Sequence, residues 1–286
     1  MNAMKLAMPI FLAALAYGPS QGLAAVITLG ADLASFAVLG ATGVTNVPTS
    51  TIGGNLGSAP NPSVGGGYVF TAGSFQQNTG IAQQAQLDLD QAILDINAQG
   101  PGLTIGSNLT GTRLPGTYTV PAAATNLTGT LILDGQGSNS AVWIFLFPST
   151  FIMSEGSDVT VTNVGNGANV GIYWSVGSAA TLDGDTLAGN VFANTLISSN
   201  GGLTLGCGRL ASATAQVTLI QDTISLGCAG FEDSGGFAEG EDTGTGGTGG
   251  SGGQVVNSVP EPATLLLFGF GLAGLFASRK RLFPVA

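Results

Sequence analysis

The sequence contains no histidine and very few basic residues, and each shortage argues against a class of function. Histidine is the commonest general base and the commonest metal ligand, so its absence lowers the expectation of catalysis and of a metal site. Between residues 26 and 228 the only basic residues are Arg113 and Arg209, against ten acidic ones. Binding to nucleic acid or to anionic lipid requires several basic residues. We therefore expect no nucleic-acid partner, no enzymatic activity, no metal and no cofactor.

Charge of either sign is scarce, at 8% of residues against about 25% in an ordinary soluble domain. Helical bundles usually cover their outer faces with Lys, Glu and Arg, which this chain does not supply. It has instead 47 glycines and many Thr, Ser, Ala and Val residues. Such a composition is typical of short strands joined by tight turns, and it predicts an all-β fold.

The N-terminal residues 1–25 have the layout of a secretory signal peptide. Lys5 precedes the apolar run 6–17, and small residues follow at 22–25, so cleavage is expected after Ala24 or Ala25. The alternative, a buried N-terminal helix, is disfavoured by the break at Gly18-Pro19.

The C-terminal residues 259–286 combine three features in order. A Pro-Glu-Pro motif at 260–262 precedes the apolar run 263–277, and the basic cluster 279–281 follows. This is a stop-transfer arrangement, although the run is shorter than the about 20 residues of a full span. The segment resembles a PEP-CTERM sorting signal. The resemblance implies transient inner-membrane anchoring, cleavage by an exosortase-type enzyme and release to the cell surface or extracellular matrix. An uncleaved anchor is the alternative.

Between the body and this tail, residues 230–258 are acidic and then rich in Gly, Ser and Thr. A segment of this composition buries too little apolar area to order itself. We predict a flexible linker there.

The body, residues 26–229, contains a repeat of about 18 residues. Blocks that begin at Gly171, Gly189 and Cys207 each carry three short alternating pieces. One such coil cannot bury its apolar side chains alone, so coils stack in parallel and share a core. The repeat predicts a parallel β-solenoid of triangular cross-section; a sandwich would not produce this period.

One segment departs from the β pattern. Residues of about 80–99 carry apolar side chains at helical spacing, namely Ile81, Ala85, Leu89, Ala92, Ile93 and Ile96. Asn78 or Thr79 can cap the start, and Gly100-Pro101 ends the helix. We predict one long α-helix packed alongside the solenoid.

The two cysteines occur in matching tripeptides, Leu205-Gly206-Cys207 and Leu226-Gly227-Cys228. Stacked strands lie about 4.8 Å apart, which a disulfide can bridge. Export permits oxidation. We predict a Cys207–Cys228 disulfide that fastens the last coil.

Alternation along the third strand of each repeat predicts a flat outer face of threonine and small residues. Leu187, Leu205 and Ile224 point inward, so their neighbours point outward. The predicted binding residues are Thr51, Thr128, Thr160, Thr186, Ala188, Thr204, Gly206, Thr223 and Ser225. Their rows repeat at about 4.8 Å between coils and about 6.6 Å along a strand, near oxygen repeats in ice.

Several segments resemble the microbial ice-binding protein family, in the order in which the family has them. They are residues 32–40, 51–57, the helix, 127–131, 172–182 and 187–191. The resemblance implies a discontinuous right-handed β-solenoid in which N- and C-terminal parts build one stack. It also implies ice binding through a flat face directed away from the helix.

Two alternatives stay open from the sequence. Asp158, Asp185 and Asp222 stand at strand ends of the proposed face, and Thr181, Thr195 and Thr218 form a rival row. The second function considered is a structural or adhesive component of an exopolysaccharide matrix, without ice activity. In either case we expect a monomer.

Overall fold

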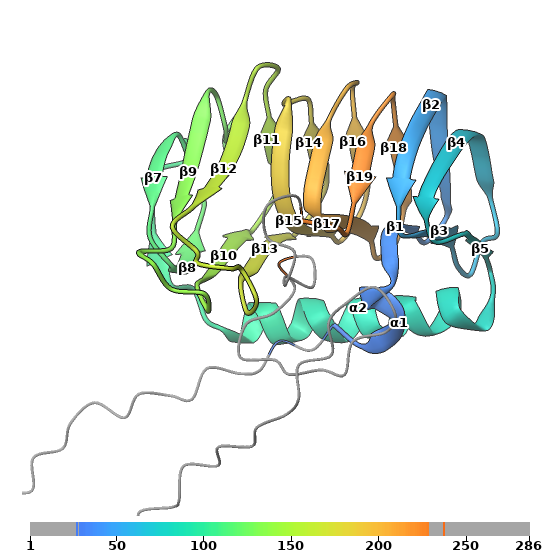
Figure 1. Cartoon of the computed structure of the whole chain (residues 1–286), viewed down its shortest axis with the longest axis horizontal. Helices are drawn as coiled ribbons and strands as arrows, with labels where there is room; N and C mark the ends of the chain where they lie inside the picture. Colours follow the sequence, from blue (N-terminus) through green and yellow to red (C-terminus); the bar gives the residue numbers. More distant parts are fainter. Residues whose placement is uncertain (1–26, 28, 229–236, 238–286) are drawn as a thin grey trace, which may run out of the picture.

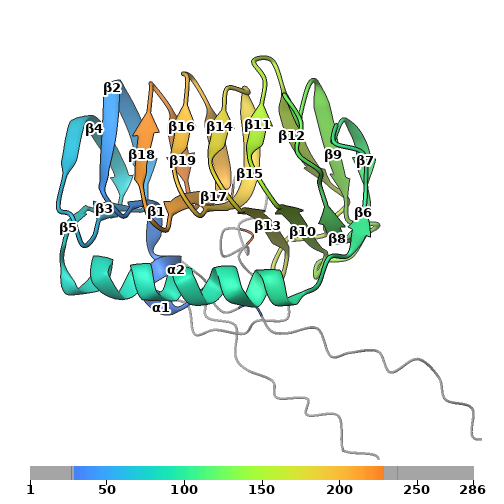
Figure 2. The same cartoon turned by 180° about the vertical axis from the view of Figure 1, so that it is seen from behind.

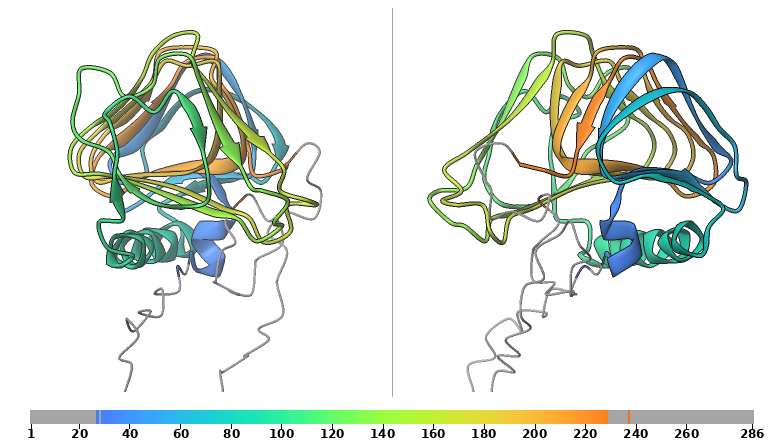
Figure 3. Two further views of the ribbon diagram at one scale, coloured as in Figure 1. Left: turned by 90° about the vertical axis from the view of Figure 1, so that its left-hand side faces the viewer. Right: turned by 45° about the vertical axis from the view of Figure 1, so that its right-hand side comes forward.

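The computed structural model describes residues 27, 29–228 and 237, and these form a parallel β-solenoid. Nineteen strands join in one sheet that winds around three sides, and the coils pair in parallel. Seen along the stack, the outline is triangular, with helix α2 (Gly80–Ala98) lying against one side (Figure 3). The predicted fold class is confirmed. The predicted signal peptide and sorting segment lie outside the described residues.

The first side, the helix-side face, is buried on both surfaces. Side chains that point inward, such as Trp143 and Trp174, fill the solenoid, while Ile144 and Tyr173 point outward into contact with the helix layer. Its strands are β1 (Phe36–Gly40), β3 (Asn55–Ser58), β5 (Phe75–Gln77), β6 (Leu103–Thr104), β8 (Gly116–Thr119), β10 (Val142–Phe147), β13 (Gly171–Val176) and the second halves of β15 (Thr186–Ala193) and β17 (Thr204–Ser212).

The other two sides rise from the helix-side face and meet opposite the helix (Figure 3). The short-strand face consists of β11 (Phe151–Met153), β14 (Ala180–Leu182), β16 (Ile197–Ser199), β18 (Gln216–Leu219) and the starts of β2 (Gly43–Gly53) and β4 (Val64–Ala72). The threonine face consists of β7 (Gly111–Arg113), β9 (Thr130–Asp134), β12 (Asp158–Thr162), β19 (Thr223–Ser225), the starts of β15 and β17 and the ends of β2 and β4.

The stack is discontinuous in sequence. On the helix-side face β1 pairs with β17, so the first coils of the chain sit on the last ones. Helix α2 then carries the chain from β5 at one end to β6 at the other (Figures 1 and 2). Its 19 residues give a length of about 28 Å, and the connecting residues at its two ends complete the about 38 Å of the eight coil spacings between β5 and β6. This confirms the implied arrangement.

Helix α2 packs through small residues. Thr79 caps it, because its hydroxyl accepts a hydrogen bond from the Ala82 N–H at 3.3 Å. The buried residues are Ala82, Ala85, Leu89, Ala92 and Ile96. The prediction for Ile81 was wrong: its side chain is 43% exposed, and Ala82 takes the buried position in the first turn. Ile93 is partly buried at the edge of the contact.

Stacked aromatic rings fill part of the interior. Phe145 lies between Tyr118 and Trp174, with ring centroids 5.5 and 4.5 Å apart. The Trp174 indole donates to the carbonyl of Ala188 at 2.9 Å, so its buried N–H is satisfied. Aromatic stacking between coils therefore adds to the parallel pairing of their backbones.

The corner between the threonine face and the helix-side face requires glycine. Gly189 has φ +93°, and a Cβ there would lie 2.5 Å from the Cβ of Ile172 in the neighbouring coil. The register of β15 against β17 shifts at this point, between Ala188 and Asn190. A side chain would therefore force adjacent coils apart.

A short helix, α1 (Ala31–Ala34), and two polar side chains join the first coil to the rest. The Arg209 guanidinium, which is buried, donates to the carbonyls of Ala34 and Phe36 at 3.3 Å each. The Asp88 carboxylate on α2 accepts from the N–H of Leu33 at 3.3 Å. The N-terminal segment is thus bound both to the C-terminal coil and to the helix.

The predicted disulfide is present. Cys207 and Cys228 are bonded, with Cα atoms 4.5 Å apart. The matching tripeptides are not opposite each other, however, because Leu205 pairs with Ile224 rather than with Leu226. The bond therefore joins Cys207, where β17 leaves the threonine face, to Cys228 in the segment that follows β19.

One residue of the predicted linker is part of the solenoid. Phe237 is buried in the interior, and its carbonyl accepts from the N–H of Ile172 and the Nδ2 of Asn190, both at 2.9 Å. The rest of the predicted linker, residues 230–258, lies outside the described residues.

Replacement of Leu89 by Ala tests the contact between the helix and the sheet. Leu89 is fully buried, so Leu89→Ala is expected to lower the free energy of unfolding by about 2–5 kcal/mol. Leu87, on the same helix, is 62% exposed, and Leu87→Ala should change it by less than about 0.5 kcal/mol. Chemical denaturation measures both, and equal effects would contradict the observed packing.

Removal of the disulfide tests how the last coil is held. The bond closes a separation of 21 residues, so Cys228→Ser should lower the free energy of unfolding by about 3 kcal/mol. The wild type with reductant should unfold like the variant. Unchanged stability in both would show that the last coil does not depend on this bond.

Candidate functional site

The outward side chains of the threonine face form two rows that run across the coils. The first row is in register from strand to strand and consists of Thr130, Asp158, Thr186, Thr204, Thr223, Thr51 and Val69. Thr186, Thr204 and Thr223 are exposed and Thr51 is half-buried. Four consecutive coils therefore present threonine at the same position.

The second row lies two residues further along each strand. It consists of Ile132, Thr160, Ala188, Gly206, Ser225 and Gly53. Parallel pairing sets about 4.8 Å between neighbours in a row, and alternation sets about 6.6 Å between the rows. Threonine has a restricted χ1, so its methyl and hydroxyl groups are held in a regular array.

Eight of the nine predicted binding residues lie in these two rows. Thr51, Thr186, Thr204 and Thr223 belong to the first, and Thr160, Ala188, Gly206 and Ser225 belong to the second.

The ninth, Thr128, lies outside both rows. It lies in the corner before β9, where its hydroxyl accepts from the Nδ2 of Asn108 at 3.3 Å, and Thr130 occupies the row. The alternation Thr130-Leu131-Ile132-Leu133 could have shown that Thr130 points outward, because Leu131 and Leu133 are the buried residues.

The three aspartates noted in the sequence have different positions. Asp158 stands in the first row, and its carboxylate accepts from the Thr186 hydroxyl at 2.7 Å. Asp185 is exposed at the corner before β15. Asp222 does not reach the face at all, since it is 1% exposed. Only Asp158 interrupts the row of threonines.

Asp222 instead holds the corner between the short-strand face and the threonine face. Its carboxylate accepts from the N–H groups of Leu203 and Ile220 at 3.0 Å each, and from the Ser199 hydroxyl. Burial raises the pKa of the Asp222 carboxyl, although these hydrogen bonds act in the opposite direction. The network fixes the turn immediately before Thr223, and thus the position of that threonine.

The rival row lies on the short-strand face, with one residue from each strand; β18 also presents Gln216 outward, next to its row member Thr218. Its members are Ile152, Thr181, Ser198, Thr218 and Thr45. Thr181 and Thr218 are as predicted, but Thr195 was wrong, because it precedes β16 and Ser198 is the residue in register. This face has a single row of half-buried residues, whereas the threonine face has two rows.

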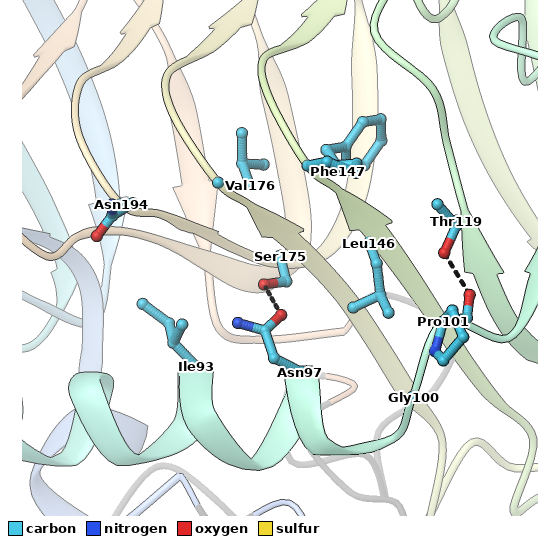
Figure 4. A pocket seen from close by; sticks show the side chains of 12 residues that line it. Ile93, Asn97, Gly100, Pro101, Thr119, Leu146, Phe147, Ser175, Val176 and Asn194 are labelled. Carbon is cyan, nitrogen blue, oxygen red and sulfur yellow. Dashed lines mark hydrogen bonds between the residues drawn. The ribbon is translucent and has the colours of Figure 1, made fainter.

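A cavity of about 560 Å³ lies where the end of α2 meets the helix-side face (Figure 4). Ile93 and Asn97 line it from the helix, and Leu146, Ser175 and Val176 line it from the strands. The Ser175 hydroxyl donates to the Asn97 side-chain oxygen at 3.0 Å. Its lining is mainly apolar and contains no titratable side chain, so no acid or base stands beside the hydroxyls of Ser175 and Thr119.

Among the described residues no helix combines the length and the apolar character needed to cross a membrane. In the same residues there is no cluster of three or more His, Cys, Asp or Glu side chains placed to hold a metal ion.

Comparison with known proteins gives two family matches. A model described as ice-binding-like matches residues 38–225, which is 188 of 286 residues. A model of the PEP-CTERM protein-sorting motif matches residues 258–281. An ice-binding protein of Nostoc sp. (strain HG1) is 32% identical over 95% of both chains.

Solved structures agree with the fold. An ice-binding protein from an Antarctic biological consortium is 31% identical, with a TM-score of 0.61, over 70% of this chain and 90% of that one. An ice-binding protein from the Antarctic ascomycete Antarctomyces psychrotrophicus is 32% identical, also with a TM-score of 0.61, over 68% of this chain and 95% of that one.

Proposed function

This chain belongs to the ice-binding-like family, and from that premise we propose that it binds ice outside the cell through its threonine face. The observation that carries the choice of face is the run of Thr186, Thr204, Thr223 and Thr51 on four consecutive coils. The protein acts by adsorption to a surface and not by catalysis.

The mechanism follows from the spacing and chemistry of the rows. Methyl groups do not hydrogen-bond water, while the hydroxyl beside each one does, so water over the face is held at fixed points without being tightly bound. Because backbone pairing sets the intervals, the held water repeats at about 4.8 and about 6.6 Å. These intervals are near oxygen repeats in ice, so such a layer merges with the crystal.

The absence of long side chains is as important as the presence of threonine. In the second row Ala188 and Gly206 leave the space beside the threonines low and open. A bulky residue in either row would hold the rest of the face away from the crystal. A bulky substitution on one face at a time therefore tests which of the two candidate faces binds ice.

We expect Thr204→Tyr to abolish most of the thermal hysteresis and of the inhibition of ice recrystallisation. Thr204 is exposed in the middle of the first row, so a tyrosine there keeps neighbouring coils from the ice. Ser198→Tyr is the matched control, because Ser198 holds the central position in the row of the short-strand face.

Loss of activity in Ser198→Tyr with retention in Thr204→Tyr would assign binding to the short-strand face instead. An inactive wild type would overturn the proposal of ice binding. Circular dichroism of each variant shows whether the solenoid is intact.

Replacement of Asp158 should have the opposite effect. Asp158→Thr joins Thr130 to the four threonines and so extends the run by two coils, and it removes a hydrated carboxylate from the row, so thermal hysteresis is expected to rise. Glu155→Thr removes one negative charge from an exposed turn outside the rows and should leave activity unchanged. An equal increase in both variants would attribute the effect to net charge and not to the face.

The PEP-CTERM motif and the ice-binding relatives support a location at the cell surface or outside the cell. We propose in addition that residues 1–25 direct export, that an exosortase-type enzyme processes the C-terminal segment after transient inner-membrane anchoring, and that residues 230–258 link the solenoid to that segment. The PEP-CTERM motif is also consistent with the second candidate function, a structural or adhesive role in an exopolysaccharide matrix. The ice assays above distinguish the two roles.

A further inference from the structure

The solenoid ends in an open strand edge at the coil that contains β4. Among the described strands, β4 pairs only with β2, and β5 pairs only with β3 (Figures 1 and 2). The outer side of β4 therefore presents backbone N–H and C=O groups, and on the threonine face this edge runs from Gly67 to Ala72. Such an edge is a template for pairing with another strand.

The two ends of the stack differ in how the edge is protected. Proteins protect strand edges with short strands, charged side chains or proline. At the far end β6 has two residues and β7 has three, of which the last is Arg113. By contrast, β4 has neither a charged residue nor a proline. It is the unprotected edge.

This edge also carries exposed apolar side chains. Val69 is 54% exposed and Phe75 is 47% exposed. The Phe75 ring packs edge-on against Tyr68 and Phe70, with centroids 5.7 and 4.8 Å apart. A partner that pairs with the backbone would cover these groups at the same time.

The distribution of charge favours a second copy of this chain as that partner. The sequence has no charged residue from 33 to 87, the segment that forms the first coils, although the whole chain has a net charge of −10. Two copies can therefore approach through this end without the like-charge repulsion that their other surfaces would create. The edge has no charge with which to select an acidic or basic partner.

The chain's own linker is a poorer occupant. Residues 232–242 contain Glu232, Asp233, Glu239, Glu241 and Asp242, and the following residues are mostly glycine and threonine. Glycine has no side chain to cover Val69 or Phe75, whereas a second β4 supplies matching apolar groups.

We propose that β4 pairs with β4 of a second copy in an antiparallel arrangement. An antiparallel pair of identical strands has its twofold axis perpendicular to the sheet, so the threonine faces of both copies lie on the same side. The first row, which ends at Val69 in each copy, then continues from one solenoid into the next. In its consequence for ice this inference rests on the proposed function, and it replaces the expectation of a monomer.

Cysteine cross-linking of the full chain on cells that export it tests the proposal. Val69→Cys should give a disulfide-linked dimer on a non-reducing gel after mild oxidation, because the central part of each edge faces its counterpart. Leu103→Cys is the control, since Leu103 is 64% exposed at the opposite end of the stack. Absence of the Val69→Cys dimer, or equal cross-linking of both variants, would overturn the proposal.

Sedimentation of the purified full chain in mild detergent gives a second measurement. The wild type should be dimeric, and Val69→Lys should weaken association at least about tenfold by placing two ammonium groups at the junction. Leu103→Lys should leave it unchanged. A wild type that stays monomeric up to about 100 μM would refute the pairing. Neither measurement uses ice, so its failure is distinguishable from failure of the proposed function.

Discussion

Parallel backbone pairing between successive coils sets the dimensions of every other feature. It places each coil about 4.8 Å from the next, whatever side chains the coil carries. The interior must then be filled within that spacing, as Tyr118, Phe145 and Trp174 do by stacking their rings. The same spacing appears on the outer surface as the interval within each row of the threonine face. A crystal-like array thus results from a constraint of the backbone and not from a special arrangement of side chains.

The discontinuous order of the stack carries an entropic cost of loop closure, and a few polar contacts offset part of it. Because β1 and β2 are far in sequence from β17 and β19, their pairing closes a long loop. Arg209, Asp88 and Asp222 all act at or near this junction, through hydrogen bonds to backbone groups of Phe36, Leu33 and Leu203. The two buried charged side chains of the described residues, Arg209 and Asp222, therefore lie where distant parts of the chain meet.

The sequence was most informative where the repeat was regular and least informative at the corners. Thr186, Thr204 and Thr223 were placed correctly because Leu187, Leu205 and Ile224 mark the inward positions on consecutive coils. Thr128 and Thr195 were misplaced because both precede strands at corners, and corner length varies. Thr181 pairs with Ser198, 17 residues on, and Ser198 pairs with Thr218, 20 residues on, so no fixed period locates both. The prediction for Ile81 was wrong for another reason. The helix packs on the sheet through alanines, and the larger side chain of Ile81 in the first turn stays exposed.

Scarcity of charge is a consequence of the same array. A long charged side chain in either row would stand above the threonines and bind water strongly in its own geometry, so acids are confined to other places. Asp222 is turned into the corner network and Asp185 lies outside the rows, while Asp158 alone stands among the threonines. Charged residues are absent from the first coils, because residues 33–87 contain none. Charge on an edge strand is also what usually prevents pairing between copies. A coil without charged side chains has a level outer surface, but its free strand edge is unprotected. The scarcity of charge therefore accounts for both the proposed binding face and the proposed contact between chains.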